Sequence, residues 1–138
     1  MEGDGLGIHD GRTVAIAGAF PGERVEARVE YVSRHHPRAG AKLLRVLQPH
    51  PERTASPCPD DVSNGGRCTG CPLGTLALAG QHAVKTELLR EVFGLEIPTI
   101  GAGESWGYRC SSKRIAFRHG PRVALGSYVR GSHHAADM

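Results

Sequence analysis

Residues 23–31 read ERVEARVEY, and this stretch decides the fold that we expect for the first third of the chain. The apolar side chains alternate with charged ones, at positions Val25, Ala27, Val29 and Tyr31. Strict alternation places every second side chain on one face of a β-strand. We therefore expect a half-buried strand here, with these four residues on its inner face.

Further strands are expected on both sides of this segment. Thr13–Ala17 is a short apolar run, and the turn-forming residues GAFPGE follow it. Ala41–Leu47 reads as a strand buried on both faces. Several short strands joined by tight turns favour a small β-barrel, because closure removes the unpaired edges of a sheet.

The rest of the chain predicts one helix and a second β region. Leu76–Phe93 has apolar residues at helical spacing, with Thr75 as the expected N-cap and Gly94 just past the end. Residues 114–118 and 123–129 read as strands that flank a hairpin turn. The 19 glycines and 9 prolines agree with many turns and few helices. The expected fold class is mainly β with one helix.

Four segments follow from this order of elements. We expect a small β-barrel at 1–48, a polar linker at 49–57, a cysteine-rich loop with its helix at 58–94, and the start of a second β domain at 95–138.

Cysteines are concentrated in the loop PCPDDVSNGGRCTGCP, residues 57–72. The chain shows neither a signal peptide nor an apolar stretch long enough to cross a bilayer, which predicts a cytoplasmic protein. Thiols in a reducing compartment are more often metal ligands than disulfides. The loop is therefore a candidate metal centre.

The spacing C-x9-C-x2-C is formed by Cys58, Cys68 and Cys71. One C-x2-C pair with an unpaired upstream cysteine suits a cubane iron–sulfur cluster better than structural zinc, which usually takes two close pairs. Zinc stays open as the alternative, with a histidine among His35, His36, His82, His133 and His134 as a further ligand. Cys110 lies apart, in the basic segment YRCSSKR, and stays open between a further ligand and a small, half-buried structural residue.

Basic residues are concentrated toward the end of the chain. Residues 105–138 hold six of them, Arg109, Lys113, Arg114, Arg118, Arg122 and Arg130, against the single acidic residue Asp137. A basic excess of this kind attracts polyanions, although a solvated surface would also show it. Trp106 and Tyr108 lie in the same segment and are candidates to stack on unpaired bases.

The order of these segments resembles one known family. GIHDGRTVAIAGAFPGERVEARV is similar to the TRAM domain, a small RNA-binding barrel. CPDDVSNGGRCTGCPLGTL with QHAVKTELLREVF resembles the iron–sulfur segment and helix of the TRAM-containing RNA (uracil-C5)-methyltransferases. ESWGYRCSSKRIAF and LGSYVRGSHHAADM resemble the start of the central RNA-binding domain of those enzymes.

The resemblance implies the site residues and their ligands. Cys58, Cys68 and Cys71 would ligate a [4Fe–4S] cluster, and Cys110 does not match the fourth ligand of the family. RNA, either ribosomal or transfer RNA, would be the partner. The residues expected to bind it are Arg34, Arg38, Trp106, Tyr108, Arg109, Lys113, Arg114, Arg118 and Arg130.

The resemblance also implies what this stretch does not contain. The first barrel strand is expected to be missing, and the catalytic domain that uses S-adenosylmethionine has no counterpart here, so we expect the chain alone to be inactive. Two other functions stay open from the sequence: a stand-alone zinc or iron–sulfur RNA-binding adaptor, and a redox or metal-sensing protein.

Overall fold

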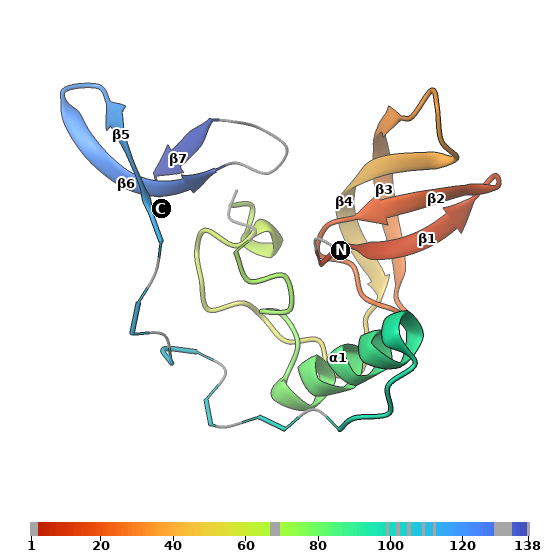
Figure 1. Ribbon diagram of the computed structural model, residues 1–138. Helices are drawn as coiled ribbons and strands as arrows, with labels where there is room; N and C mark the ends of the chain where they lie inside the picture. Colours follow the sequence, from red (N-terminus) through yellow and green to blue (C-terminus); the bar gives the residue numbers. More distant parts are fainter. Residues whose placement is uncertain are drawn as a thin grey trace. The chain divides into compact units, whose positions relative to one another are not determined.

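The computed structural model describes residues 3–66, 70–98, 100–101, 103–104, 106–108, 110–111, 113–128 and 134–137. These residues form two compact units, unit 1 (Met1–Arg53) and unit 2 (Thr54–Met138). Figure 1 shows strands β1 to β4 in unit 1, and the helix α1 with strands β5 to β7 in unit 2. The expected class, mainly β with one helix, is confirmed.

Unit 1 is a four-stranded sheet in the order β1-β2-β4-β3. Its strands are β1 (Gly5–His9), β2 (Arg12–Ile16), β3 (Arg24–Val32) and β4 (Arg38–Gln48). β1 and β2 form an antiparallel hairpin, β2 pairs with β4 in parallel, and β3 and β4 pair antiparallel along most of their length. No strand is predicted before Thr13, because the two glycines of GLGIH interrupt the alternation of apolar and polar side chains that would indicate β1.

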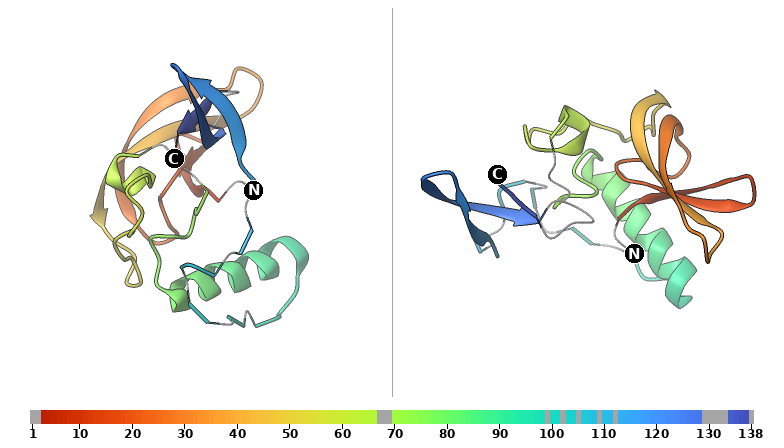
Figure 2. Two further views of the ribbon diagram at one scale, coloured as in Figure 1. Left: turned by 90° about the vertical axis from the view of Figure 1, so that its left-hand side faces the viewer. Right: turned by 90° about the horizontal axis from the view of Figure 1, so that it is seen from above.

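The described strands of unit 1 do not close into the expected barrel. β1 and β3 lie at the two ends of the strand order, and no pairing joins them. Three register shifts interrupt the pairing of β3 with β4. Bulges of this kind increase local bend and twist, and the views in Figures 1 and 2 show a bent, open sheet.

The core of unit 1 is small. Four apolar residues are buried: Val14, Ala19, Phe20 and Ala39. On β3, the expected inner face is buried only in part. Val25 and Ala27 are half-buried, whereas Val29 and Tyr31 are 50% and 59% exposed. The prediction is therefore wrong for the second half of β3, because no described layer of unit 1 covers it.

β4 also differs from the expected strand with two buried faces. Leu43 and Val46 are half-buried, but Leu44 and Leu47 are about half exposed, at 51% and 48%. The apolar run thus has one inner face and one outer face. A short apolar run does not by itself reveal how many layers cover a sheet.

In unit 2, α1 (Leu78–Phe93) begins two residues later than the expected start. Ala77 is its N-cap and makes no side-chain capping bond, so the assignment of Thr75 is wrong. Thr75 is buried, and its carbonyl accepts a hydrogen bond from the amide of Thr54 (2.8 Å). Gly94 ends the helix as expected, with a left-handed φ of 65°.

The three-stranded sheet of unit 2 confirms the expected hairpin. β5 (Ile115–His119) and β6 (Arg122–Tyr128) pair antiparallel, and β7 (Ala135–Asp137) pairs with β6. Gly120 in the turn has a φ of 62°. Within the described part of the chain, no helix is long and apolar enough to span a bilayer.

Candidate metal centre and nucleic-acid interface

Hydrogen bonds hold the backbone of Cys58, the first candidate ligand, in a defined place. Its amide donates to the Oγ atom of Ser56 (3.3 Å). Its carbonyl accepts from the side-chain amide of Asn64 (2.8 Å) and from the backbone amide of Asp61 (3.2 Å). The half-buried thiol therefore starts from a fixed backbone position.

Asp61 organises the loop that follows. Its carboxylate is buried and accepts from both the amide (2.8 Å) and the hydroxyl (2.7 Å) of Ser63, which starts the 3-10 helix η1 (Val62–Asn64). Asn64 also donates to the carbonyl of Ser56 (3.0 Å). The long spacing between Cys58 and Cys68 is thus filled by an ordered turn up to Gly66. Neither Asp61 nor Asn64 is predicted from the sequence as part of the site, although both are residue types that bond to nearby backbone.

Cys71 lies in a second turn, on the exposed surface of unit 2. Its carbonyl accepts from the amide of Gly74 (2.8 Å). Cys68, the third predicted ligand, is outside the described residues. The two described thiols fit an iron–sulfur cluster in donor type, because such clusters are held by thiolates. Among described residues, no three Cys, His, Asp or Glu side chains gather at one point.

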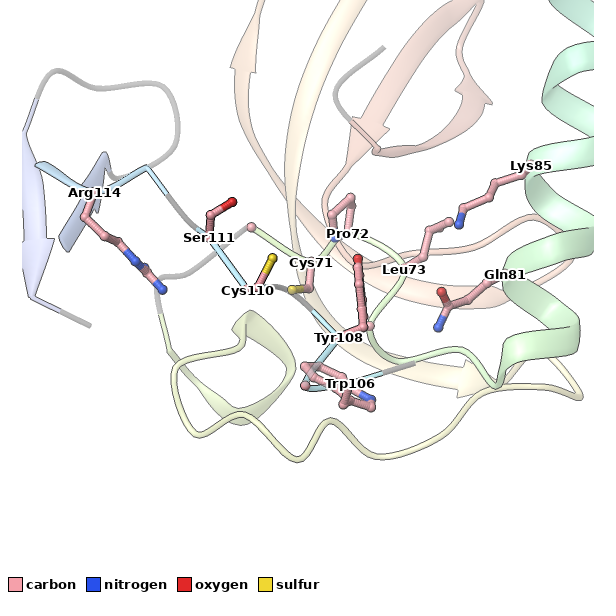
Figure 3. A pocket seen from close by; sticks show the side chains of 13 residues that line it. Cys71, Pro72, Leu73, Gln81, Lys85, Trp106, Tyr108, Cys110, Ser111 and Arg114 are labelled. Atoms are coloured by element: carbon pink, nitrogen blue, oxygen red, sulfur yellow. The ribbon is translucent and has the colours of Figure 1, made fainter. Parts of the chain in front are cut away.

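A cavity of about 570 Å³ lies beside Cys71 in unit 2. Figure 3 shows the side chains around it, with those of Cys71 and Cys110 on the same side. Three of the predicted RNA-binding residues, Trp106, Tyr108 and Arg114, contribute to its wall. Gln81 and Lys85 of α1 complete the polar part of the lining.

The other predicted RNA-binding residues of unit 2 do not line this cavity. Lys113 and Arg118 are exposed elsewhere on the surface. Arg109 and Arg130 are outside the described residues. Of the predicted RNA-binding residues of unit 2, the structure therefore places Trp106, Tyr108 and Arg114 at one cavity. Arg118, the other described arginine of that group in unit 2, does not line it.

Unit 1 contains a shallower, more open hollow of about 730 Å³ between the β1–β2 turn and the β3–β4 loop. We call it the basic hollow. It is lined by Arg12, Arg34, His35 and His36, with Asp10 as the one acidic side chain among the described lining. Arg34 was predicted to bind RNA, whereas Arg12 was missed, because it is separated from the loop in sequence. Arg38 is exposed at the start of β4 and is not part of the lining.

The end of unit 1 is fixed by an ion pair between Glu23 and Arg53. Both carboxylate oxygens of Glu23 accept from the guanidinium, at 2.5 and 2.7 Å. The same carboxylate accepts from the amides of Phe20 and His50, each at 2.9 Å. Arg53 also donates to the carbonyl of Gly18 (2.6 Å) and lies over the ring of Phe20. The pair thus holds residues 50–53, part of the expected linker, against unit 1.

Burial of the Glu23 carboxylate, whose side chain has no exposed surface, is the largest single influence on its pKa and raises it. The hydrogen bond from Arg53, the two backbone amides and the charge of Arg53 act in the opposite direction and prevail. The pKa of Glu23 is therefore held below its usual value. This carboxylate is a structural group, because its oxygen atoms are already bonded within unit 1.

Comparisons with known proteins agree with the resemblance. No protein-family model matches the chain. The chain is 37% identical to the 23S rRNA (uracil(1939)-C(5))-methyltransferase RlmD of Alkalilimnicola ehrlichii, over 99% of this chain and 32% of that protein. It is 34% identical to the RlmD of Bordetella pertussis, over 100% of this chain and 30% of that protein.

An uncharacterized RNA methyltransferase of Geobacter sulfurreducens is 33% identical, over 99% of this chain and 28% of that protein. The chain is thus homologous along its length to a portion of RNA methyltransferases. Two of these relatives are 23S rRNA (uracil-C5)-methyltransferases of the RlmD type. The chain spans about a third of the length of the relatives it matches.

Proposed function

We propose that this chain is the N-terminal RNA-binding and iron–sulfur portion of an S-adenosylmethionine-dependent RNA (uracil-C5)-methyltransferase that acts in the cytoplasm on ribosomal or transfer RNA. The observation that carries the proposal is the similarity of the whole chain to about a third of RlmD-type enzymes. Methyl transfer itself would belong to the remaining two thirds of such an enzyme.

RNA binding would use two described surfaces. In unit 1, the basic hollow offers one arginine at the start of β2, and one arginine and two histidines in the β3–β4 loop, which can contact a phosphate backbone. In unit 2, the cavity beside Cys71 carries aromatic and cationic side chains but no described carboxylate. Cations hold phosphates and aromatic rings stack on bases, so both surfaces suit single-stranded RNA.

The metal centre would be held by Cys58, Cys68 and Cys71. A cluster bound by these thiolates would join the two turns of the loop and stabilise their folded arrangement. The network around Cys58, made by Ser56, Asp61 and Asn64, supports this role because it holds the backbone of the first ligand in a defined position.

The proposal is tested with the chain purified without oxygen. We expect it to bind RNA with an affinity that falls steeply as salt rises, because phosphate contacts release counterions. With labelled S-adenosylmethionine and RNA, we expect no methyl transfer. Methyl transfer by this chain alone would contradict the assigned portion, and undetectable RNA binding at low salt would contradict the RNA-binding role.

Metal analysis of the same sample tests the cluster. We expect iron and acid-labile sulfide together with a visible absorption band, all reduced by Cys71→Ser. Stoichiometric zinc without iron would replace the cluster by the zinc alternative. A sample with neither metal, after anaerobic reconstitution with iron and sulfide, would remove the metal centre from the proposal.

A further inference from the structure

Two aromatic side chains give the unit 2 cavity a surface on which a planar ring can stack. Tyr108 is 68% exposed and Trp106 is 37% exposed, and both belong to the wall. The ring of Trp106 packs against Gly74, because a Cβ atom added at Gly74 would lie 3.1 Å from it. Trp106 is thus the less exposed of the two rings, and Tyr108 presents the more accessible one; Figure 3 shows both side chains.

Helix α1 contributes polar groups at a spacing of one turn. Gln81 and Lys85 are four residues apart, so they lie on the same face of the helix. The Nε2 atom of Gln81 donates to the carbonyl of Leu76 (3.0 Å). In the Gln81 side chain only the NH₂ group can donate to a carbonyl, so this bond fixes which way the Gln81 amide is turned. The Oε1 atom and the second N–H remain able to bond to the edge of a ligand.

The charges and the size of the cavity limit the class of ligand. Its described lining includes the cations Lys85 and Arg114 and no Asp or Glu. A volume of about 570 Å³ falls within the usual range of small-molecule sites. Aromatic rings, a fixed amide and two cations match the base and the phosphate of a nucleotide, whereas a purely apolar ligand would leave the cations without a role.

We propose that this cavity binds one unpaired nucleotide of an RNA strand. The base stacks on Tyr108 beside Trp106, Gln81 bonds to the edge of the base, and Lys85 and Arg114 contact the flanking phosphates. This inference rests on the proposed RNA-binding function and adds a defined single-nucleotide site to it.

Trp106 is the one tryptophan of the sequence, so its fluorescence reports on this cavity directly. The experiment titrates the anaerobic full-length chain with a single-stranded oligouridine RNA of twelve nucleotides. A strand of the same length without bases is the matched probe. We expect saturable quenching by the oligouridine and little quenching by the abasic strand, because only the first can stack.

Variants separate the cavity from general RNA binding. Tyr108→Ala is expected to weaken oligouridine binding about tenfold, since a base–aromatic stack is worth about 1–3 kcal/mol and each 1.4 kcal/mol is tenfold. Tyr108→Phe keeps the ring and should bind like the unchanged protein. Tyr128→Ala removes a similarly exposed tyrosine outside the cavity and is expected to change the affinity by less than about twofold.

The outcomes distinguish the inference from the function on which it rests. If no variant and no unchanged protein binds either strand, the proposed RNA-binding function fails. If the unchanged protein binds RNA but Tyr108→Ala binds equally well, or the abasic strand quenches equally, the nucleotide site is wrong while RNA binding stands. Circular dichroism of each variant checks that a loss of binding is not a loss of folding.

Discussion

Glu23 is the residue on which the end of unit 1 depends most. Its carboxylate makes bonds to Arg53 and to two backbone amides, and its side chain has no exposed surface. A buried charge without its partner is strongly destabilising, whereas an exposed pair contributes little. The chain offers a matched exposed pair, Arg45 with Glu26, at the same distance of 2.5 Å.

We predict that Arg53→Ala lowers the free energy of unfolding of unit 1 by about 3 kcal/mol, because it leaves the Glu23 carboxylate buried and unpaired. Arg45→Ala is expected to cost less than about 1 kcal/mol, since both partners of that pair are largely exposed. Urea unfolding followed by circular dichroism measures both values. Equal decreases in the free energy of unfolding would show that the buried Glu23–Arg53 pair stabilises unit 1 no more than the exposed pair does.

The pH dependence follows from the lowered pKa of Glu23. The unfolded carboxyl titrates near pH 4.3, so the stabilisation is present above that pH and is lost as pH falls toward the lower folded pKa. In Arg53→Ala the lowering of the pKa by Arg53 is lost and only the amides of Phe20 and His50 still oppose the effect of burial, so the pKa of Glu23 is lowered less and protonation costs this variant less stability. The difference between the two proteins should therefore shrink below about pH 4, and a constant difference from pH 7 to pH 3 would contradict this assignment.

At the scale of elements, the turn from Ser56 to Gly66 is a scaffold for Cys58. It contains no long apolar run, and its order comes from Asp61 at the start of η1 and from Asn64, which bonds to two carbonyls. Side chains of this kind compete well with regular structure and produce local turns. The first thiol is thus positioned by polar bonds.

We predict that Asn64→Ala lowers the iron and sulfide content of the reconstituted chain and destabilises unit 2 by about 1–2 kcal/mol, because the hydrogen bonds from Asn64 to the carbonyls of Ser56 and Cys58 are lost. Asn64→Asp keeps the shape of the side chain but places a carboxylate oxygen next to the two carbonyl oxygens. It should therefore lower the metal content and the stability at least as much. Ser63→Ala removes one bond to Asp61 without touching Cys58 and is the control. Unchanged metal content in both Asn64 variants would show that the position of Cys58 does not depend on this side chain.

At the scale of the whole molecule, basic side chains are spread over both units. The basic hollow of unit 1 joins Arg12, the first residue of β2, with Arg34 from the β3–β4 loop. The hollow is open to solvent and its described lining contains several cationic or polar side chains, so it suits phosphate contacts that do not read sequence.

We predict that Arg12→Ala and Arg34→Ala each weaken RNA binding regardless of base sequence. Each should also reduce the slope of log affinity against log salt by about 1, because one phosphate contact is lost. Arg45→Ala, an exposed arginine paired with Glu26, is the control with little expected change. Fluorescence anisotropy at several salt concentrations measures the slopes, and unchanged slopes would exclude phosphate contacts at the hollow.

Turns and helix ends depend on neighbouring residues and can be predicted from the sequence alone. The hairpin turn at 119–122 and the end of α1 at Gly94 were both predicted, because glycine at a left-handed position and alternation along a strand are local signals. The resemblance to RNA methyltransferases was also readable, because it depends on the order of residues alone.

Which residues meet across long stretches of chain depends on the tertiary structure. The second half of β3 is exposed, β1 and β3 form the two edges of the sheet without pairing with each other, and Glu23 pairs with Arg53. Gln81 and Lys85 of α1 line one cavity together with Trp106, Tyr108 and Arg114. These contacts depend on how strands and turns pack in space, and that packing leaves no periodic pattern in the sequence.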